Sequence, residues 1–186
     1  MTKEEGKELL KLARKVIHAR LDGSDIDDVH IGRVKHLEKK QGVFVTIKIN
    51  NELRGCIGFP LPVFPLFEAV MRAADAAAFD DPRFPPLSAK ELKNVKLELS
   101  VLTAPEKINV RKVEEYPKKI KVGKDGLIVR FHGYSGLLLP QVAPEWGWDA
   151  ETFLSQTCVK AGLSSNMWLA EKDLIIEKFQ AQIFEE

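Results

Sequence analysis

The segment Leu53–Gly58 places a cation, a thiol and two glycines within a run of otherwise apolar residues. Cys56 is a nucleophile when it is ionised, and a nearby cation favours the ionised form. Arg54 stands two residues before Cys56, so in a strand both side chains lie on one face. Gly55 and Gly58 each weaken a strand by about 0.5–1 kcal/mol relative to alanine, which indicates a bulge or a close approach by another group. We therefore expect a functional site at this segment.

Both reactive side chains of this segment have a functional and a structural interpretation. Cys56 is either a catalytic nucleophile, which would need a general base such as histidine, or a small buried residue, as free cysteines often are. Of the four histidines, only His132 lies close in sequence to a motif. Arg54 either clamps a carboxylate or phosphate with two hydrogen bonds or forms an internal ion pair with Asp80 or Asp81.

Three other segments add candidate ligand-binding residues. The turn-forming sequence Asp81–Phe84 either anchors the fold or lines a site with Arg83. Gln141 follows an apolar run, and its amide can orient a ligand or fix loop backbone. Lys160 is a second cation for the site or part of a solvated helix face. The predicted ligand-binding set is therefore Arg54, Gly55, Gly58, Arg83, Gln141 and Lys160.

Two more features near these segments also allow two interpretations. Cys158 shares a helical stripe with apolar residues, which predicts a core position. The tryptophans of Trp146–Trp148 either pack in the core or, if exposed, bind a partner or a base.

The charge and cysteine content exclude some classes of function. The chain has 28 Lys and Arg against 27 Asp and Glu, so its net charge offers no global attraction for nucleic acid or an anionic membrane. The near-neutral total does not exclude a local basic patch that binds nucleic acid. Two cysteines far apart in sequence fit a reducing, cytoplasmic setting. Neither a signal region nor a membrane-length apolar run is present. No phosphate loop, zinc pattern or dinucleotide fingerprint occurs, so we predict no metal and no cofactor. The Lys- and Glu-rich composition hints at a thermophile.

Hydrophobic periodicity predicts helices mixed with strands joined by tight turns. The mixture predicts an α+β fold with mostly antiparallel pairing. The expected helices cover 3–21, 66–79 and 150–161, and the expected strands cover 43–49, 53–59, 95–102 and 173–184. Residues 22–42 are expected to form a loop with a short helical turn.

The register of the first hairpin decides which face carries the candidate residues. Asn50–Asn51 suits a two-residue turn because asparagine tolerates positive φ. The favoured register then places Cys56 opposite Val45, with Arg54 on the same apolar face. A longer loop would shift the pairing by one residue and place both side chains on the polar face beside Thr46.

Four segments of the chain together resemble a known family. They are Leu53–Gly58, Asp81–Phe84, Leu138–Ala143 and Cys158–Leu163. They are similar to the AMME chromosomal-region family, the AMMECR domain, over nearly the whole chain. The resemblance implies a single domain over 1–186 with an α+β fold. It also implies a larger lobe that gathers both chain ends, a smaller lobe and a cleft between them.

The resemblance supplies an association but no reaction. Similar domains occur beside, or joined to, a Memo-like domain and a radical-SAM protein, which implies a shared modification pathway. From the residues we expect a cleft around Leu53–Gly58 that recognises a small anionic ligand or a peptide carboxylate. Arg54 would supply the charge and Gln141 would orient the ligand. The alternatives are a non-catalytic interaction module and a Cys56-dependent enzyme.

Overall fold

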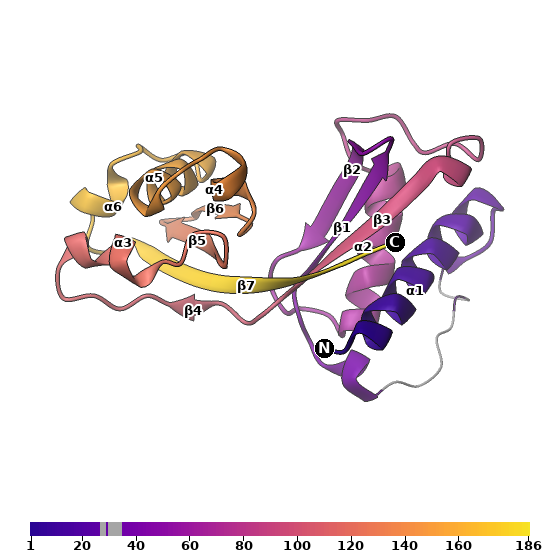
Figure 1. The fold of residues 1–186 in the computed structure, drawn as a ribbon, viewed down its shortest axis with the longest axis horizontal. Coiled ribbons are helices and arrows are strands. Elements are labelled where there is room, and N and C mark those ends of the chain that lie inside the picture. The colour runs from indigo at the N-terminus through magenta and orange to yellow at the C-terminus, as the bar shows by residue number, and fades with distance from the viewer. Residues whose placement is uncertain (27–28, 30–34) are drawn as a thin grey trace. The chain divides into compact units, whose positions relative to one another are not determined.

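The computed structural model describes residues 1–26, 29 and 35–186. It has an α+β fold, as predicted, and the chain divides into two compact units (Figure 1). The N-terminal unit contains Met1–Leu102 together with Gln182–Glu186, and the C-terminal unit contains Thr103–Ala181. Both chain ends therefore belong to the N-terminal unit. Across the described ranges, no helix combines the length and the apolar composition needed to cross a membrane.

The N-terminal unit is an antiparallel sheet with two long helices. The sheet order is β2-β1-β3, with the C-terminal end of β7 beside β3. Its elements are α1 (Lys3–Leu21), η2 (Lys35–Glu38), β1 (Val43–Ile49), β2 (Glu52–Phe59), α2 (Leu66–Phe79), η3 (Leu92–Asn94), β3 (Val95–Leu102) and the end of β7 (Ile175–Glu185). The predicted helices 3–21 and 66–79 and strands 43–49 and 95–102 are confirmed with these bounds. The helical turn expected within 22–42 is η2, whereas residues 27–28 and 30–34 of that loop lie outside the described residues.

The helices bury one face of this sheet and leave the other face to polar side chains. Alternate residues of β1 and β3 that point toward α1 and α2 are fully buried, among them Val45, Ile47 and Leu99. On the opposite face Thr46 lies between Cys56 and Glu98, and all three are half-buried. We call this second surface, formed by Thr46, Lys48, Cys56 and Glu98, the polar face.

The C-terminal unit contains the other strands of this antiparallel sheet, and a helix packs on them. β5 pairs with both β6 and β7, and β4 pairs with β7. Its elements are β4 (Glu106–Lys107), η4 (Val113–Glu115), α3 (Tyr116–Lys119), β5 (Asp125–Phe131), β6 (Tyr134–Leu138), α4 (Val142–Glu145), α5 (Ala150–Lys160), α6 (Met167–Ala170) and the start of β7. Asp149 caps α5 as predicted, by accepting a hydrogen bond from the backbone N–H of Thr152 at 2.8 Å.

The last strand departs from its predicted burial pattern. Alternation along this strand predicts that Ile175, Phe179, Ala181 and Ile183 face inward. Phe179 is buried as predicted, but the side chains of Ile175 and Ile183 are 39% and 47% exposed. The buried positions are Ile176, Phe179 and Phe184. β7 runs through both units, so its buried side chains serve two cores and do not follow one alternation.

Candidate functional site

A bulge sets the register of the β1–β2 hairpin. Asn50 and Asn51 have φ of 54° and 66°, as the predicted two-residue turn requires. Lys48 pairs with Leu53, but Ile47 then pairs with Gly55, so Arg54 is the extra residue of a β-bulge. The favoured register, with Cys56 opposite Val45, is therefore wrong. Cys56 pairs with Thr46 on the polar face, which is the outcome expected for a longer loop but reached by a bulge.

Gly55 explains why the bulge occurs here. A Cβ atom on this residue would lie 2.1 Å from the carbonyl oxygen of Ala77 in α2. Helix α2 can therefore approach the strand only where a glycine faces it. A Cβ on Gly58 would lie 2.3 Å from the carbonyl oxygen of Val43. At both glycines, protein atoms occupy the space that a side chain would fill.

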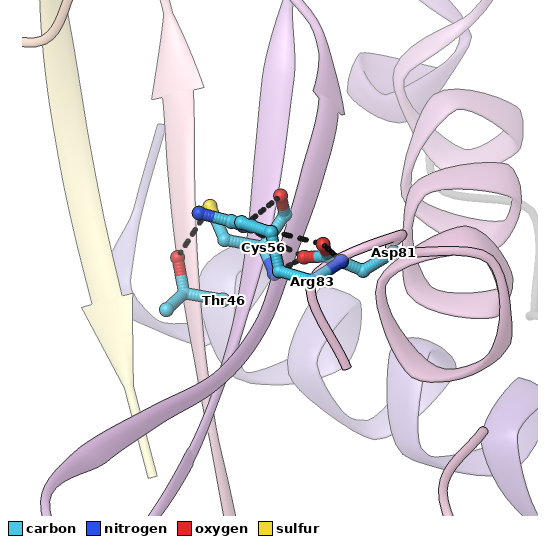
Figure 2. Close-up of polar contacts among 4 residues, drawn as sticks. All are labelled: Thr46, Cys56, Asp81 and Arg83. Carbon is cyan, nitrogen blue, oxygen red and sulfur yellow. Dashed lines mark hydrogen bonds and ion pairs between the residues drawn. The ribbon is translucent and has the colours of Figure 1, made fainter. Parts of the chain in front are cut away.

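Cys56 is held at the edge of the sheet by two charged side chains (Figure 2). Its backbone N–H donates to Asp81 Oδ2 at 2.9 Å, and its carbonyl oxygen accepts from Arg83 Nη2 at 3.1 Å. These side chains occupy the place of a neighbouring strand and close this part of the edge. The backbone groups of Cys56 thus point away from β1, so its pair with Thr46 is of the close, non-hydrogen-bonded kind. Accordingly, Thr46 Oγ1 donates to Cys56 Sγ at 3.3 Å.

Asp81 fixes Arg83 without burying it. The Asp81 carboxylate is 2% exposed and accepts from Arg83 Nε at 2.9 Å and from Nη2 at 2.7 Å. These bonds to Arg83 are the main reason why the pKa of Asp81 lies far below its usual range, although burial alone would raise it. The same bonds raise the pKa of Arg83.

One edge of the Arg83 guanidinium remains available. The side chain is 53% exposed. Its Nε and Nη2 groups are used by Asp81 and by the carbonyl of Cys56, whereas Nη1 hydrogen-bonds to none of the described residues. The site therefore presents a thiol, a hydroxyl and a positioned cation on one surface.

Arg54 forms an internal ion pair, which is one of the two alternatives drawn from the sequence. Its partner is Glu91, not Asp80 or Asp81: Arg54 Nε donates to Glu91 Oε1 at 2.8 Å, and Nη2 donates to the Pro85 carbonyl at 2.9 Å. The Arg54 side chain is 14% exposed. The bond to Arg54, helped by two from Ser88, lowers the pKa of Glu91 to about 2. Because so little of the Arg54 side chain is exposed, a ligand carboxylate has little access to this cation.

The remaining candidates lie in the C-terminal unit. Gln141 precedes α4, and its Oε1 is buried without a hydrogen-bond partner among the described residues. Lys160 is exposed at the end of α5. Cys158 is fully buried, as predicted, and burial raises the pKa of its thiol. Trp146 is 70% exposed and stacks on Trp148 with ring centroids 6.0 Å apart.

Sequence reasoning thus found Cys56 and Arg83 but missed their partners. Thr46 was named only for the alternative register, and Asp81 only as a turn residue or as a partner of Arg54. The signal that pointed to them was Gly55, since a glycine within a strand indicates a bulge. Over the parts of the chain that are described, no three His, Cys, Asp or Glu side chains gather closely enough to hold a metal ion.

The helices and the antiparallel sheet, with a cysteine site at its β2 edge, define this molecule as an α+β protein. The chain belongs to the AMMECR1 family, whose model matches residues 10–184, and this confirms the resemblance drawn from the four segments. Protein PF1979 of Pyrococcus furiosus is 53% identical over 192 residues, which cover 98% of this chain and 89% of that protein. Protein NEQ441 of Nanoarchaeum equitans is 50% identical, with 96% and 98% covered.

A solved structure has the same fold. The crystal structure of the uncharacterized protein PH0010 from Pyrococcus horikoshii matches with a TM-score of 0.90 at 50% identity. The match covers 100% of this chain and 93% of that one. These similarities establish the family and the fold, and they assign no reaction.

Proposed function

We propose that the protein recognises a small anionic ligand, or the carboxylate of a peptide, on the polar face beside Cys56. The observation that carries this proposal is the Arg83 guanidinium, half exposed and positioned next to a half-buried thiol and the Thr46 hydroxyl. Arg83 takes the role that the sequence suggested for Arg54, because both arginines have a carboxylate partner but Arg83 is 53% exposed and Arg54 only 14%.

Asp81 prepares Arg83 for binding. A long side chain that is already fixed loses little conformational entropy when a ligand arrives. The Nη1 group offers two N–H donors to an oxyanion, and the charge of the guanidinium strengthens such bonds. Since Asp81 offsets that charge, the site selects by hydrogen-bond geometry more than by net charge, and modest affinity is expected.

A second candidate function is thiol chemistry at Cys56. The hydroxyl of Thr46 donates to the sulfur, and the Arg83 guanidinium donates to the carbonyl oxygen of Cys56, so two donors lie beside the thiol. The third hypothesis is a non-catalytic interaction module. In that case the Asp81–Arg83 pair serves only to close the strand edge.

Ligand protection of Cys56 tests the first proposal. The protein is alkylated with iodoacetamide, and the rate is followed by intact mass in the presence of N-acetylglycine or inorganic phosphate. Either anion should slow alkylation saturably at about 10 mM or below, whereas the neutral N-acetylglycinamide should not. Arg83→Gln should abolish protection, and Arg72→Gln, which removes an exposed arginine of α2, should leave it intact.

Two results would contradict the proposal. One is an alkylation rate that neither anion changes. The other is equal protection in the wild type and in Arg83→Gln, which would place any anion elsewhere. If the protein turns over a thiol-reactive substrate, and if Cys56→Ser abolishes that turnover, the result would favour the hypothesis of a Cys56-dependent enzyme.

The family resemblance supports a proposal about partners. We propose that the protein acts in the cytoplasm within a modification pathway that includes Memo-like and radical-SAM proteins, and that nucleic acid is not its main ligand. Co-purification of the tagged chain with either kind of protein from its own host would support the pathway. Failure to detect either one under mild cross-linking would count against it.

A further inference from the structure

The C-terminal unit contains a cavity that takes no part in the Cys56 site. Its volume is about 390 Å³, and it lies at the tip of the β5–β6 hairpin beside the start of β7. The side chains that matter for its chemistry are Arg130, Phe131, His132, Tyr134, Ser135 and Asp173. Its volume falls at the small end of the range for small-molecule sites.

Three aromatic rings line this cavity. Phe131 and Tyr134 face each other across the hairpin as the last pair of the ladder. The His132 ring stands edge-on to Phe131, with centroids 4.3 Å apart and planes at 86°. Tyr134 is 56% exposed, so its ring is accessible to a ligand. Exposed aromatic faces of this kind stack well on planar heterocycles.

The backbone at His132 places an imidazole at the tip of the hairpin. His132 has φ of 43° and Gly133 has φ of 90°, so the two residues form a tight turn with both φ positive. Such turns favour asparagine at the first position, and histidine is also among the residues that adopt positive φ. The other two-residue turn of this chain does use asparagine, at Asn50. At the cavity the chain has an imidazole instead.

The polar groups of the cavity can serve both donors and acceptors on a ligand. Arg130 is held by Glu177 at 3.1 Å and faces Ser135 across the ladder. Asp173 is exposed just before β7 and supplies a carboxylate. The edge of a nucleobase carries donors and acceptors side by side, and a carboxylate accepts well from base N–H groups. Guanine offers two adjacent N–H donors to one carboxylate.

We propose that this cavity binds the base of a free nucleoside or nucleotide. The base stacks on Tyr134 and His132, and Asp173 accepts from its N–H groups. A single small molecule is favoured over a nucleic acid strand because the whole chain carries a formal net charge of only +1, which offers little attraction for a phosphate backbone. This inference stands independently of the proposal at Cys56.

Equilibrium dialysis with GMP tests the proposal on the full chain. GMP should bind saturably and more tightly than UMP, whose smaller base stacks less and offers one N–H donor. Ribose 5-phosphate, which has the sugar and phosphate without a base, should not bind measurably. Tyr134→Ala and Asp173→Asn should each weaken GMP binding about tenfold. The matched controls Trp146→Ala and Glu171→Gln alter an exposed aromatic and an exposed carboxylate outside the cavity, and should change nothing.

The variant His132→Asn separates ligand binding from folding. Asparagine suits the positive φ, so the thermal midpoint should stay the same or rise, while GMP binding weakens at least fivefold. Unchanged GMP affinity in both His132→Asn and Tyr134→Ala would overturn the proposal. It would also be overturned by equal binding of ribose 5-phosphate. A short G-rich oligonucleotide that binds far more tightly than GMP, with steep salt dependence, would show a nucleic acid site instead.

Discussion

Replacing Glu91 with glutamine should destabilise the N-terminal unit by about 1.5 kcal/mol. The pKa of Glu91 is about 2, against an ordinary value of 4.5. If the whole pKa difference contributed to the free energy of unfolding, it would correspond to about 3 kcal/mol at neutral pH. Because the Glu91 side chain is 33% exposed, solvent screening reduces this to about 1.5 kcal/mol. The variant also leaves the guanidinium of Arg54, which is 14% exposed, without its counter-charge.

Glu68→Gln is the matched control for this prediction. The Glu68 side chain is also 33% exposed, but its partner Arg72 is 51% exposed and lies one helical turn away. Its loss should cost about 0.5 kcal/mol or less. The difference in stability loss between the two variants therefore measures the effect of burying the cationic partner.

Urea unfolding at neutral pH, followed by circular dichroism, measures both variants. Tryptophan fluorescence would not report on the N-terminal unit, since all three tryptophans (Trp146, Trp148 and Trp168) lie in the C-terminal unit. If Glu91→Gln lowers the free energy of unfolding no more than Glu68→Gln does, the description of Arg54 as a structural residue is wrong.

Three further predictions concern the same elements. The pKa of Glu91 is lower in the folded state than in the unfolded state, so its contribution to stability is fully present above about pH 4.5 and is lost as the pH falls toward 2. In urea unfolding, the free energies of unfolding of the wild type and of Glu91→Gln should therefore become equal in acid. Gly55→Ala should lower the free energy of unfolding by at least about 3 kcal/mol, because its Cβ meets the backbone of α2. Gly133→Ala, where the Cβ meets open space but φ is 90°, should lower it by about 1 kcal/mol. Equal losses of stability in thermal unfolding would refute the close approach of α2 to Gly55. In the folded protein Cys158 should resist alkylation, because it is fully buried and its pKa is raised, so a second adduct on intact mass would contradict its core position.

Local patterns in the sequence predicted most of the N-terminal elements. The helices and strands there have strong periodicity, and Asn50–Asn51 marks the turn between two of the strands. The register failed because it depends on a contact between residues distant in sequence. Gly55 must accommodate the carbonyl of Ala77, and the resulting bulge turns Cys56 to the other face.

The partners of the charged residues could not be predicted for the same reason. An internal ion pair of Arg54 with Asp80 or Asp81 was one of two alternatives drawn from the sequence, but the pair with Glu91 depends on how the loop after α2 returns to the sheet. Glu91 looked like a helix-capping residue, and it does accept hydrogen bonds from both the backbone N–H and the hydroxyl of Ser88. One carboxylate serves both roles, which local spacing alone does not reveal.

The C-terminal unit was less predictable. Short helices such as α4 and α6 have too few residues to show periodicity. The sequence Gly123–Gly126 has the composition of a hairpin turn, which predicts strands on both sides of it, but residues 121–124 form a turn and β5 begins at Asp125. The cavity beside His132 is formed by residues from two separate segments, and nothing in the local pattern joins them.

The central claim is that Arg83 makes the surface around Cys56 favourable to anions. The most direct test compares alkylation of Cys56 by iodoacetate, which is anionic, with alkylation by neutral iodoacetamide. The ratio of the iodoacetate rate to the iodoacetamide rate should be about threefold higher in the wild type than in Arg83→Gln. This difference corresponds to about 0.6 kcal/mol, which is typical of a partly exposed charge. High salt should reduce the difference. An identical ratio in the two proteins, with both folded, would contradict the account.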